Sequence, residues 1–179
     1  MKKVLIVSSS LRGGSNSDIL AREVQKGALD AGNDVEYISL KGKNIKFCIG
    51  CLSCQKTYKC VQTDDMADLI DKVQNADVLV FATPIYYYEM SGQLKTFLDR
   101  CNPLFPQKNK FKDVYLITSS YDDAVNASDR AISGIKGWIE CFEQSHFAGA
   151  VVGGGLNNPK DAKKQDDLLQ KAYELGKNV

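Results

Sequence analysis

Short apolar runs alternate along the chain with segments of helical periodicity. Runs rich in Val, Ile, Leu and Phe are typical of strands buried on both faces of a sheet. They predict strands at residues 4–7, 35–38, 78–81, 114–117 and 147–152, with the third interrupted by Thr83 and Pro84. Between them, apolar positions at three- and four-residue spacing predict helices at about 17–32, 66–73, 94–101, 128–143 and 160–177.

This alternation predicts an α/β fold, in which a parallel sheet is covered by helices on both faces. Right-handed crossovers and five strands favour a three-layer doubly wound sheet of flavodoxin-like order 2-1-3-4-5. The length of 179 residues is that of one domain, spanning residues 1–179. Ligands of such sheets bind at the carboxyl ends of the strands, so we expect the loops after strands one, three and four to form the site.

Composition and charge limit the partners and the cellular compartment that we expect for the protein. The chain carries 23 basic and 22 acidic residues, a balance that predicts neither nucleic acid nor an anionic membrane as partner. No apolar stretch approaches the roughly 18 residues that span a bilayer, and the short run at residues 4–7 reads as a buried strand rather than a signal peptide. We therefore expect a cytoplasmic protein, in which clustered cysteines are more often redox-active or metal-binding than disulfide-bonded.

The first loop, residues 8–17, reads SSSLRGGSNS. Hydroxyl groups, one guanidinium group and the free N–H groups of a helix start suit a phosphate monoester. The loop lacks both the dinucleotide-binding and the nucleoside-triphosphate glycine motifs. Serine- and glycine-rich loops also simply cap helices, and the loop alone leaves both interpretations open.

The loop after the third strand is rich in aromatic residues. Residues 83–92 read TPIYYYEMSG, and three consecutive tyrosines at a strand end cannot all face the core. A flat ring ligand needs apolar or aromatic walls and backbone groups at its polar edge. A subunit interface is the alternative role, particularly for Tyr88. Residues 118–121, TSSY, follow the fourth strand and add hydroxyl groups and one further ring.

Four of the six cysteines lie close together in a long loop at about 41–62, at positions Cys48, Cys51, Cys54 and Cys60. This spacing suits a four-iron four-sulfur cluster, and Lys46, Lys56 and Lys59 would favour thiolates. Zinc sites usually have a longer stretch between their ligand pairs, so zinc fits less well. A third alternative is a loop that covers a cofactor and binds no metal.

Two segments resemble the NADPH-dependent FMN reductase family. They are the motif Ser-x-Ser-x-Arg-x-x-Ser-Asn-Ser at residues 8–17 and the run TPIY…MSGQLKTFLDR at residues 83–100. The cysteine spacing, followed by Asp64-Asp65-Met66, resembles the iron–sulfur flavoprotein branch of that family. The resemblance extends to about residue 122. It implies that the FMN phosphate is held by Ser10, Arg12, Ser15, Asn16 and Ser17, and the ring by Pro84, Ile85, Tyr86, Tyr87, Ser119 and Tyr121.

The resemblance implies an FMN-dependent NAD(P)H oxidoreductase that passes electrons to a small acceptor of quinone or flavin type, or to a redox protein. An electron carrier with an iron–sulfur cluster on the four cysteines is the alternative, and a homodimer or homotetramer is expected. Ser9 departs from the glycine common in the family and is expected to adjust the loop, because glycine alone reaches positive φ without strain. Cys101, Cys141, Trp138 and His146 are expected to have structural roles.

Overall fold

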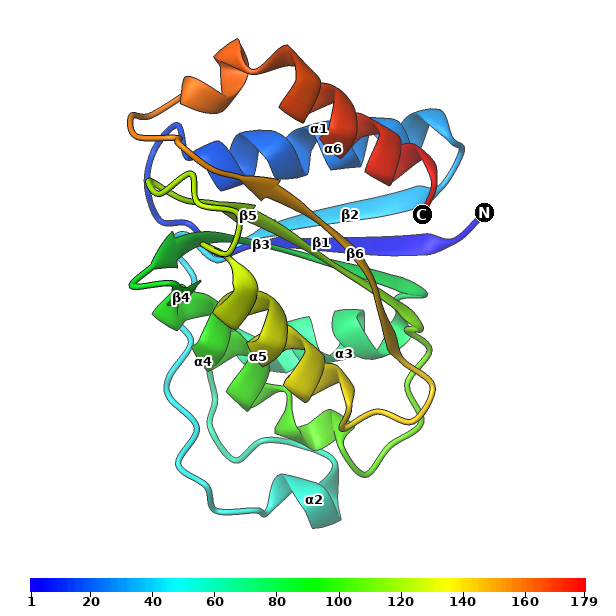
Figure 1. Cartoon of the computed structure of the whole chain (residues 1–179). Coiled ribbons are helices and arrows are strands. Elements are labelled where there is room, and N and C mark those ends of the chain that lie inside the picture. The colour runs from blue at the N-terminus through cyan, green and yellow to red at the C-terminus, as the bar shows by residue number, and fades with distance from the viewer.

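The computed structural model describes residues 1–179 as a three-layer α/β structure (Figure 1). Five parallel strands form the central sheet in the order β2-β1-β3-β5-β6. A short strand β4 pairs antiparallel with the end of β3. The strands are β1 (Lys3–Ser8), β2 (Asp34–Ser39), β3 (Val78–Tyr86), β4 (Glu89–Met90), β5 (Asp113–Ser119) and β6 (His146–Gly153).

Helices cover both faces of the sheet (Figure 1). Helices α1 and α6 lie on one face, and α3, α4 and α5 lie on the other. The helices are α1 (Asn16–Asp30), α2 (Cys54–Thr57), α3 (Met66–Asn75), α4 (Gly92–Arg100), α5 (Asp129–Ile139) and α6 (Asp166–Lys177), with 3-10 turns η1 (Asn102–Leu104) and η2 (Asp161–Lys164).

Alternation along β1 explains the two cores. Val4 and Ile6 point to the core beneath α1 and α6, while Leu5 and Val7 point to the larger core beneath α3, α4 and α5. Successive side chains of a strand face opposite sides of the sheet, so a continuous apolar run is required when both sides are covered. The doubly wound order predicted from the sequence is therefore confirmed, with β5 and β6 as the fourth and fifth strands of the sheet.

Three local predictions need correction. Strand β3 is not interrupted at Thr83 and Pro84, because Pro84 pairs with Ser119 of β5 and the strand continues to Tyr86. Helix α5 ends at Ile139, so Cys141 lies beyond it and is exposed, whereas Cys101 is buried as expected. The final helical segment is split into η2 and α6.

Two other expectations concerned single residues. The Nε2 atom of His146 lies 3.0 Å from Oδ1 of Asp113, so this histidine does have a partner. The ring of Trp138 packs against Phe81, Phe111 and Phe142, consistent with a packing role. No helix of the structure combines the length and apolar character needed to cross a membrane.

Candidate active site

The carboxyl ends of β1, β3 and β5 bring three loops together at one edge of the sheet. The loop after β1 leads into α1, whose Ser15 side chain caps the helix by accepting from the N–H of Asp18 at 3.4 Å. The backbone N–H groups of Ser10, Leu11 and residues 13–17 donate to no acceptor within the protein. A row of free donors at the start of a 15-residue helix is suited to an anion.

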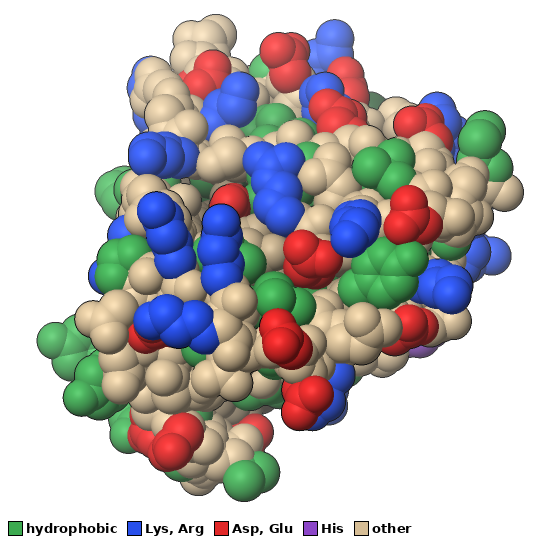
Figure 2. All heavy atoms as spheres, turned by 90° about the horizontal axis from the view of Figure 1, so that it is seen from above, with side chains coloured by type: hydrophobic (Ala, Val, Ile, Leu, Met, Phe, Trp, Pro, Cys, Tyr) green, Lys and Arg blue, Asp and Glu red, His purple; other side chains and the backbone are tan.

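The side chains of this loop differ in their exposure and in the contacts that they make within the protein. Arg12 is exposed and forms no ion pair within the protein. Ser10 is buried, and its Oγ accepts from the N–H of Arg12. Ser15 and Ser17 are also buried, with their hydroxyl oxygens 3.1 Å apart. Seen from the α1–α6 side, Lys and Arg side chains gather over the end of the molecule where α1 begins (Figure 2).

The side chain of Asn16 is engaged within the protein. Its Nδ2 donates to the carbonyl oxygens of Leu156 and Asn158, and its Oδ1 accepts from the N–H of Ala162 at 3.1 Å. The side chain therefore ties the segment after β6 to the first loop. The backbone N–H of Asn16 is itself one of the free donors of the first loop.

The first loop is also anchored to the second. Ser9 Oγ donates to the carbonyl oxygen of Ala82 and accepts from Ser91 Oγ, each at 2.9 Å. Ser91 in turn caps α4 by accepting from the N–H of Leu94. Ser9 is not among the residues with positive φ, so the strain expected from the absence of glycine does not arise.

A second anchor was not found from the sequence. Asp18 accepts hydrogen bonds from Ser8 Oγ and from the hydroxyl of Tyr37, and the guanidinium of Arg22 lies 3.3 Å from the centroid of the Tyr37 ring. Burial, and then the hydrogen bond to Asp18, raise the pKa of Tyr37 well above its ordinary value. The carboxylate of Asp18 thus accepts hydrogen bonds from two uncharged hydroxyl groups.

The aromatic loop is a tight hairpin between β3 and β4. Tyr86 pairs with Glu89, so Tyr87 and Tyr88 are the two central residues, with φ of 53° and 66°. Such turns need positive φ at both positions and favour Asn and Gly, and bulky side chains there are strained. The Tyr87 side chain is 97% exposed, and Tyr86 and Tyr88 are about half exposed. The alternative role that we considered for Tyr88, in an interface, is compatible with this exposure.

An open pocket of about 620 Å³ lies between this hairpin and the loops after β5 and β6. Ile85, Tyr87 and Tyr88 line one side, and Tyr121 lines the other with Ser120. The hydroxyl of Tyr88 donates to Oδ2 of Asp122 at 2.9 Å across the pocket. The volume is within the range of small-molecule sites. Pro84, Tyr86 and Ser119 adjoin this pocket in sequence but do not line it.

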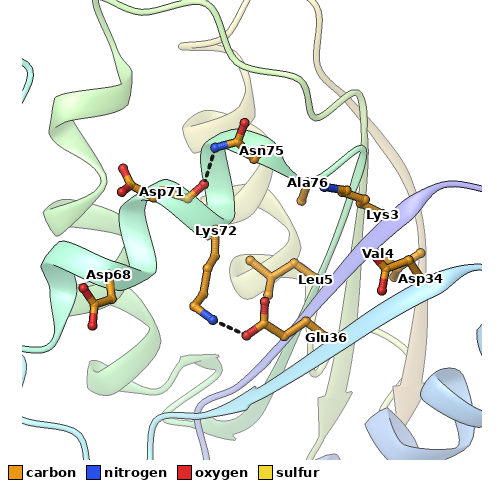
Figure 3. Close-up of a pocket in the computed structure, with 10 residues that line it drawn as sticks. All are labelled: Lys3, Val4, Leu5, Asp34, Glu36, Asp68, Asp71, Lys72, Asn75 and Ala76. Carbon is orange, nitrogen blue, oxygen red and sulfur yellow. Dashed lines mark hydrogen bonds and ion pairs between the residues drawn. The ribbon is translucent and has the colours of Figure 1, made fainter.

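A second hollow, of about 400 Å³, lies where β1 and β2 begin, beside the end of α3 (Figure 3). The ion pair of Lys72 with Glu36 crosses it, and no aromatic side chain lines it. It is at the amino end of the parallel strands, away from the three loops. The pocket beside the tyrosine hairpin is therefore the candidate active site.

The cysteine loop lies apart from the sheet and passes beneath α4 to α2 (Figure 1). All four cysteines line one small pocket together with Arg100. Cys54 is buried, Cys60 is partly buried, and Cys48 and Cys51 are exposed. Burial, and then the negative charge of Cys60, raise the pKa of Cys54, whereas hydrogen bonds from the Ser53 backbone and hydroxyl lower that of Cys51.

Arg100 is the cation that faces these thiols, rather than the lysines singled out from the sequence. Its Nη1 and Nη2 bind the two carboxylate oxygens of Asp64 at 2.6 and 2.9 Å, and Nη2 lies 3.5 Å from Cys60 Sγ. The Arg100 and Asp64 side chains are 1% and 0% exposed, and Arg100 Nε has no partner. This pairing joins residues 36 positions apart, and only the spacing of Asp64 from Cys60 could have hinted at it.

The four thiols and the buried guanidinium fit a negatively charged iron–sulfur cluster in donor type. However, no group of three or more His, Cys, Asp or Glu side chains is arranged to hold a metal ion. The four thiols are therefore chemically suitable ligands for an iron–sulfur cluster, but their positions in this structure do not form a metal-binding site.

Residues 2–141 match the sequence model of the NADPH-dependent FMN reductase family. The chain belongs to this family. An iron–sulfur flavoprotein of Methanocaldococcus jannaschii is 31% identical over 99% of this chain and 95% of its own. A Bacillus subtilis protein named as an NAD(P)H-dependent FMN-containing oxidoreductase, YwqN, is 32% identical over 97% of this chain and 96% of its own.

Solved structures show the same fold. An azoreductase from Bacillus anthracis superposes with a TM-score of 0.74 at 17% identity, covering both chains completely. An NAD(P)H:quinone oxidoreductase from Methanothermobacter marburgensis gives a TM-score of 0.73 at 15% identity over 99% of this chain and 96% of its own. As a member of the FMN reductase family, the protein is a flavin-dependent NAD(P)H oxidoreductase. The free donors of its first loop, and the aromatic pocket at the same end of the sheet, are compatible with FMN.

Proposed function

We propose that the protein uses NAD(P)H to reduce a small planar acceptor of the quinone type by two electrons. In the balanced reaction, NAD(P)H, one proton and the quinone give the oxidised nicotinamide and the hydroquinone. FMN supplies the redox chemistry by accepting a hydride equivalent from the nicotinamide and releasing two electrons to the acceptor. The observation that carries the proposal is the aromatic pocket beside a loop with free N–H donors, at one edge of the sheet.

The phosphate of FMN would be held mainly by backbone groups. The free N–H groups of residues 13–17 and the positive end of α1 favour a dianion. Arg12 and the hydroxyls of Ser10, Ser15 and Ser17 would complete the site, with Asn16 contributing its N–H. The anchors at Ser9 and Asn16 hold this loop in place before the ligand arrives, which reduces the ordering that binding costs.

The flavin ring would lie against residues 84–87 and the segment Ser119–Tyr121. Pro84 pairs with β5 and fixes the direction of the chain there, so the following backbone groups are rigidly placed. Tyr87 and Tyr121 supply exposed aromatic surface on the two sides of the pocket. Hydride transfer between two rings needs no acid or base from the protein, so these residues act by orienting the rings and limiting access of water.

A quinone-type acceptor is supported by the openness of the pocket and by its aromatic sides. Two proteins of the same fold, named as an NAD(P)H:quinone oxidoreductase and an azoreductase, support this choice of acceptor. A second planar molecule can stack where the tyrosines are exposed, which a closed cavity would not allow. Reduction of flavin-type acceptors is compatible with the same shape.

Rapid mixing under anaerobic conditions tests the proposal. FMN-loaded protein is mixed with NADPH or NADH, and the flavin absorbance is followed. We expect it to bleach and to return when menadione is added. If neither nicotinamide bleaches the flavin faster than it bleaches free FMN, the protein is not an NAD(P)H-dependent reductase of the proposed kind.

An electron carrier with a four-iron four-sulfur cluster is the second candidate. It is favoured by the four cysteines that share one pocket with the buried guanidinium of Arg100. Protein prepared without oxygen should then contain iron and acid-labile sulfide. Replacing Cys54 with serine should remove both, whereas replacing the exposed Cys141, outside the pocket, should remove neither. Absence of iron and sulfide from the anaerobic wild-type protein would rule this candidate out.

We also propose a homodimer or homotetramer. Phe47, Ile49 and Leu52 on the cysteine loop are more than half exposed, as are Tyr87 and Tyr121 at the active site. Apolar surface of this kind often marks an interface. Sedimentation equilibrium at micromolar concentration should give a multiple of the 19.8 kDa chain mass. A single species of chain mass would contradict the proposal.

A further inference from the structure

The pocket beside the tyrosine hairpin has a neutral floor and a charged rim. Ser120 and Ala127 are buried at its base and Ile85 is half-buried, whereas Tyr87, Tyr121 and Asp123 are exposed at its mouth. Aromatic rings and carboxylates therefore border the mouth of the pocket. An entering molecule therefore meets the exposed residues at the mouth before it meets the buried residues at the base.

Asp122 is built into this rim. Its Oδ1 accepts from the N–H of Ala124 and its Oδ2 from the hydroxyl of Tyr88, each at 2.9 Å. These two hydrogen bonds, the backbone one first, lower the pKa of Asp122. Its carbonyl oxygen also accepts from Ser120 Oγ at 2.7 Å. The carboxylate is thus held ionised in a defined position across the pocket from Ile85.

The neighbouring Asp123 is held against the loop that follows β6. A Cβ on Gly154 would lie 2.9 Å from the Cα of Asp123, so only glycine allows this approach. The same loop donates the N–H of Gly155 to the carbonyl oxygen of Asp122. This contact keeps the Asp123 side chain at the exposed mouth of the pocket, where its position is set by backbone packing.

No cation of the protein neutralises this rim. None of the six ion pairs involves Asp122 or Asp123. The lining of the pocket contains no Lys, Arg or His. Arg130 lies outside the lining, with its guanidinium carbon 5.9 Å from the centroid of the Tyr88 ring. The mouth of the pocket therefore carries two negative charges.

We propose that Asp122 and Asp123 set the charge class of the acceptor, so that the pocket takes neutral or cationic planar acceptors and rejects anionic ones such as sulfonated quinones. The inference rests on the proposed function, which it refines. Repulsion between like charges raises the energy of an anion at the mouth, while the tyrosine rings still attract its flat face. The donor carries its negative charges on phosphate groups away from the reacting nicotinamide ring, which is neutral before hydride transfer, so the inference concerns the acceptor alone.

The experiment isolates the acceptor half of the reaction. FMN-loaded protein is reduced with dithionite and mixed without oxygen with menadione or with a sulfonated naphthoquinone, and the return of the flavin absorbance is timed. Each rate is divided by the rate for free reduced FMN with the same acceptor, which removes differences in intrinsic reactivity. We expect the normalised rate for menadione to exceed that for the sulfonate by about fivefold or more at low salt.

Asp123→Asn removes one charge without removing a hydrogen bond that holds the fold. It should raise the normalised rate for the sulfonate relative to that for menadione by about fivefold at low salt. Asp71→Asn is the matched control, because it makes the same change in net charge in the hollow at the far end of the sheet (Figure 3). It should change neither rate.

Three results would overturn the inference. They are equal normalised rates for the two acceptors in the wild-type protein, an equal response of Asp123→Asn and Asp71→Asn, and no reoxidation by either acceptor. Because dithionite replaces the nicotinamide, these results do not depend on the donor. Failure of NAD(P)H to reduce the flavin would contradict the proposed function and would leave the charge preference measurable.

Discussion

At the scale of single residues, some side chains of the first loop hold the loop in place, whereas others are placed to bind a ligand. Asn16 and Ser9 use their side chains to fasten the loop to segments far away in the sequence. Arg12 forms no ion pair and is exposed, and Ser15 lies beside the free N–H groups, with its Oγ accepting from the N–H of Asp18. We therefore expect the energetic contribution of side chains to phosphate binding to be concentrated in these two residues.

Replacing Arg12 and Ser15 together with alanine should weaken FMN binding by about 100-fold or more, because hydrogen bonds to charged groups are worth about 1.5–3 kcal/mol each. Quenching of flavin fluorescence during titration of the apoprotein measures the affinity. Riboflavin, which lacks the phosphate, is the control ligand and should bind both proteins with similar affinity. An unchanged FMN affinity would show that the phosphate lies elsewhere.

The buried ion pair of Asp64 with Arg100 predicts a pH dependence of stability. The hydrogen bond from Arg100, followed by those from the backbone, lowers the pKa of Asp64 from its ordinary value of 3.8 to about 2. Because the folded-state pKa is below the unfolded-state pKa, this contribution is complete above pH about 4. It is lost as the pH falls toward 2, and it amounts to about 2 kcal/mol.

Asp64→Asn should remove that part of the acid dependence and destabilise the protein by about 3–5 kcal/mol at neutral pH, since it leaves the buried Arg100 unpaired. Urea unfolding between pH 2 and 7 measures both effects. Asp65→Asn provides a neighbouring control, because Asp65 is exposed and accepts only the N–H of Asn44. Equal curves for the wild-type protein and Asp64→Asn would contradict the assignment.

At the scale of elements, the hairpin between β3 and β4 stores strain beside the active site. Tyr87 has φ of 53° although its side chain is almost fully exposed, so packing within the chain does not explain the choice of tyrosine. A functional contact by its ring would explain it. The strained backbone of this hairpin then places an aromatic side chain at the mouth of the pocket.

Tyr87→Asn should stabilise the protein by about 0.5–1 kcal/mol, because asparagine tolerates this backbone conformation better, and should also weaken FMN binding or turnover. Tyr87→Phe keeps both ring and strain, so it should resemble the wild-type protein in both respects. Thermal unfolding and flavin titration measure the two quantities. A Tyr87→Asn protein that gains stability and keeps full affinity and turnover would show that the ring has no role.

The crossing of α1 and α6 depends on two glycines that allow the helices to approach closely. A Cβ on Gly27 would lie 2.0 Å from the carbonyl oxygen of Tyr173, and one on Gly176 would lie 2.0 Å from that of Val24. Backbone atoms cannot move aside as side chains can. These glycines are therefore required by the packing of the two helices.

Gly176→Ala should destabilise the protein by about 1–3 kcal/mol through overpacking. Gly137→Ala is the matched control in α5, where a Cβ meets open space, and it should stabilise by about 0.5–1 kcal/mol. Urea unfolding of the two variants measures the difference. If Gly176→Ala is as stable as Gly137→Ala, the helices do not pack as closely as described.

At the scale of the whole molecule, α4 connects the active site to the cysteine loop. Ser91 at its start donates to Ser9 in the first loop, and Arg100 at its end holds Asp64 and approaches Cys60. One helix thus joins the proposed flavin-binding edge of the sheet to the thiols. Any redox-active group on the cysteine loop would have a fixed position relative to the pocket through this helix.

Periodicity alone was enough to predict the parallel sheet, its strand order and the edge where the loops meet. The reason is that burial on both faces demands continuous apolar strands such as Val78–Phe81, and right-handed crossovers leave few orders. The motifs around Arg12 and Tyr86 also indicated the family, because both are contiguous in the sequence. These features depend on neighbouring residues, which a single sequence displays directly.

Tertiary structure decided the contacts between distant segments. The side chain of Asn16 meets residues 140 and more positions away, Arg100 meets Asp64, and the loop after β6 places Asp123 at the mouth of the pocket. Strand β3 continues through Pro84 because β5 is beside it, and Cys141 is exposed because α5 ends two residues earlier. Such contacts follow from which elements are neighbours in space, and local patterns of polarity do not contain that information.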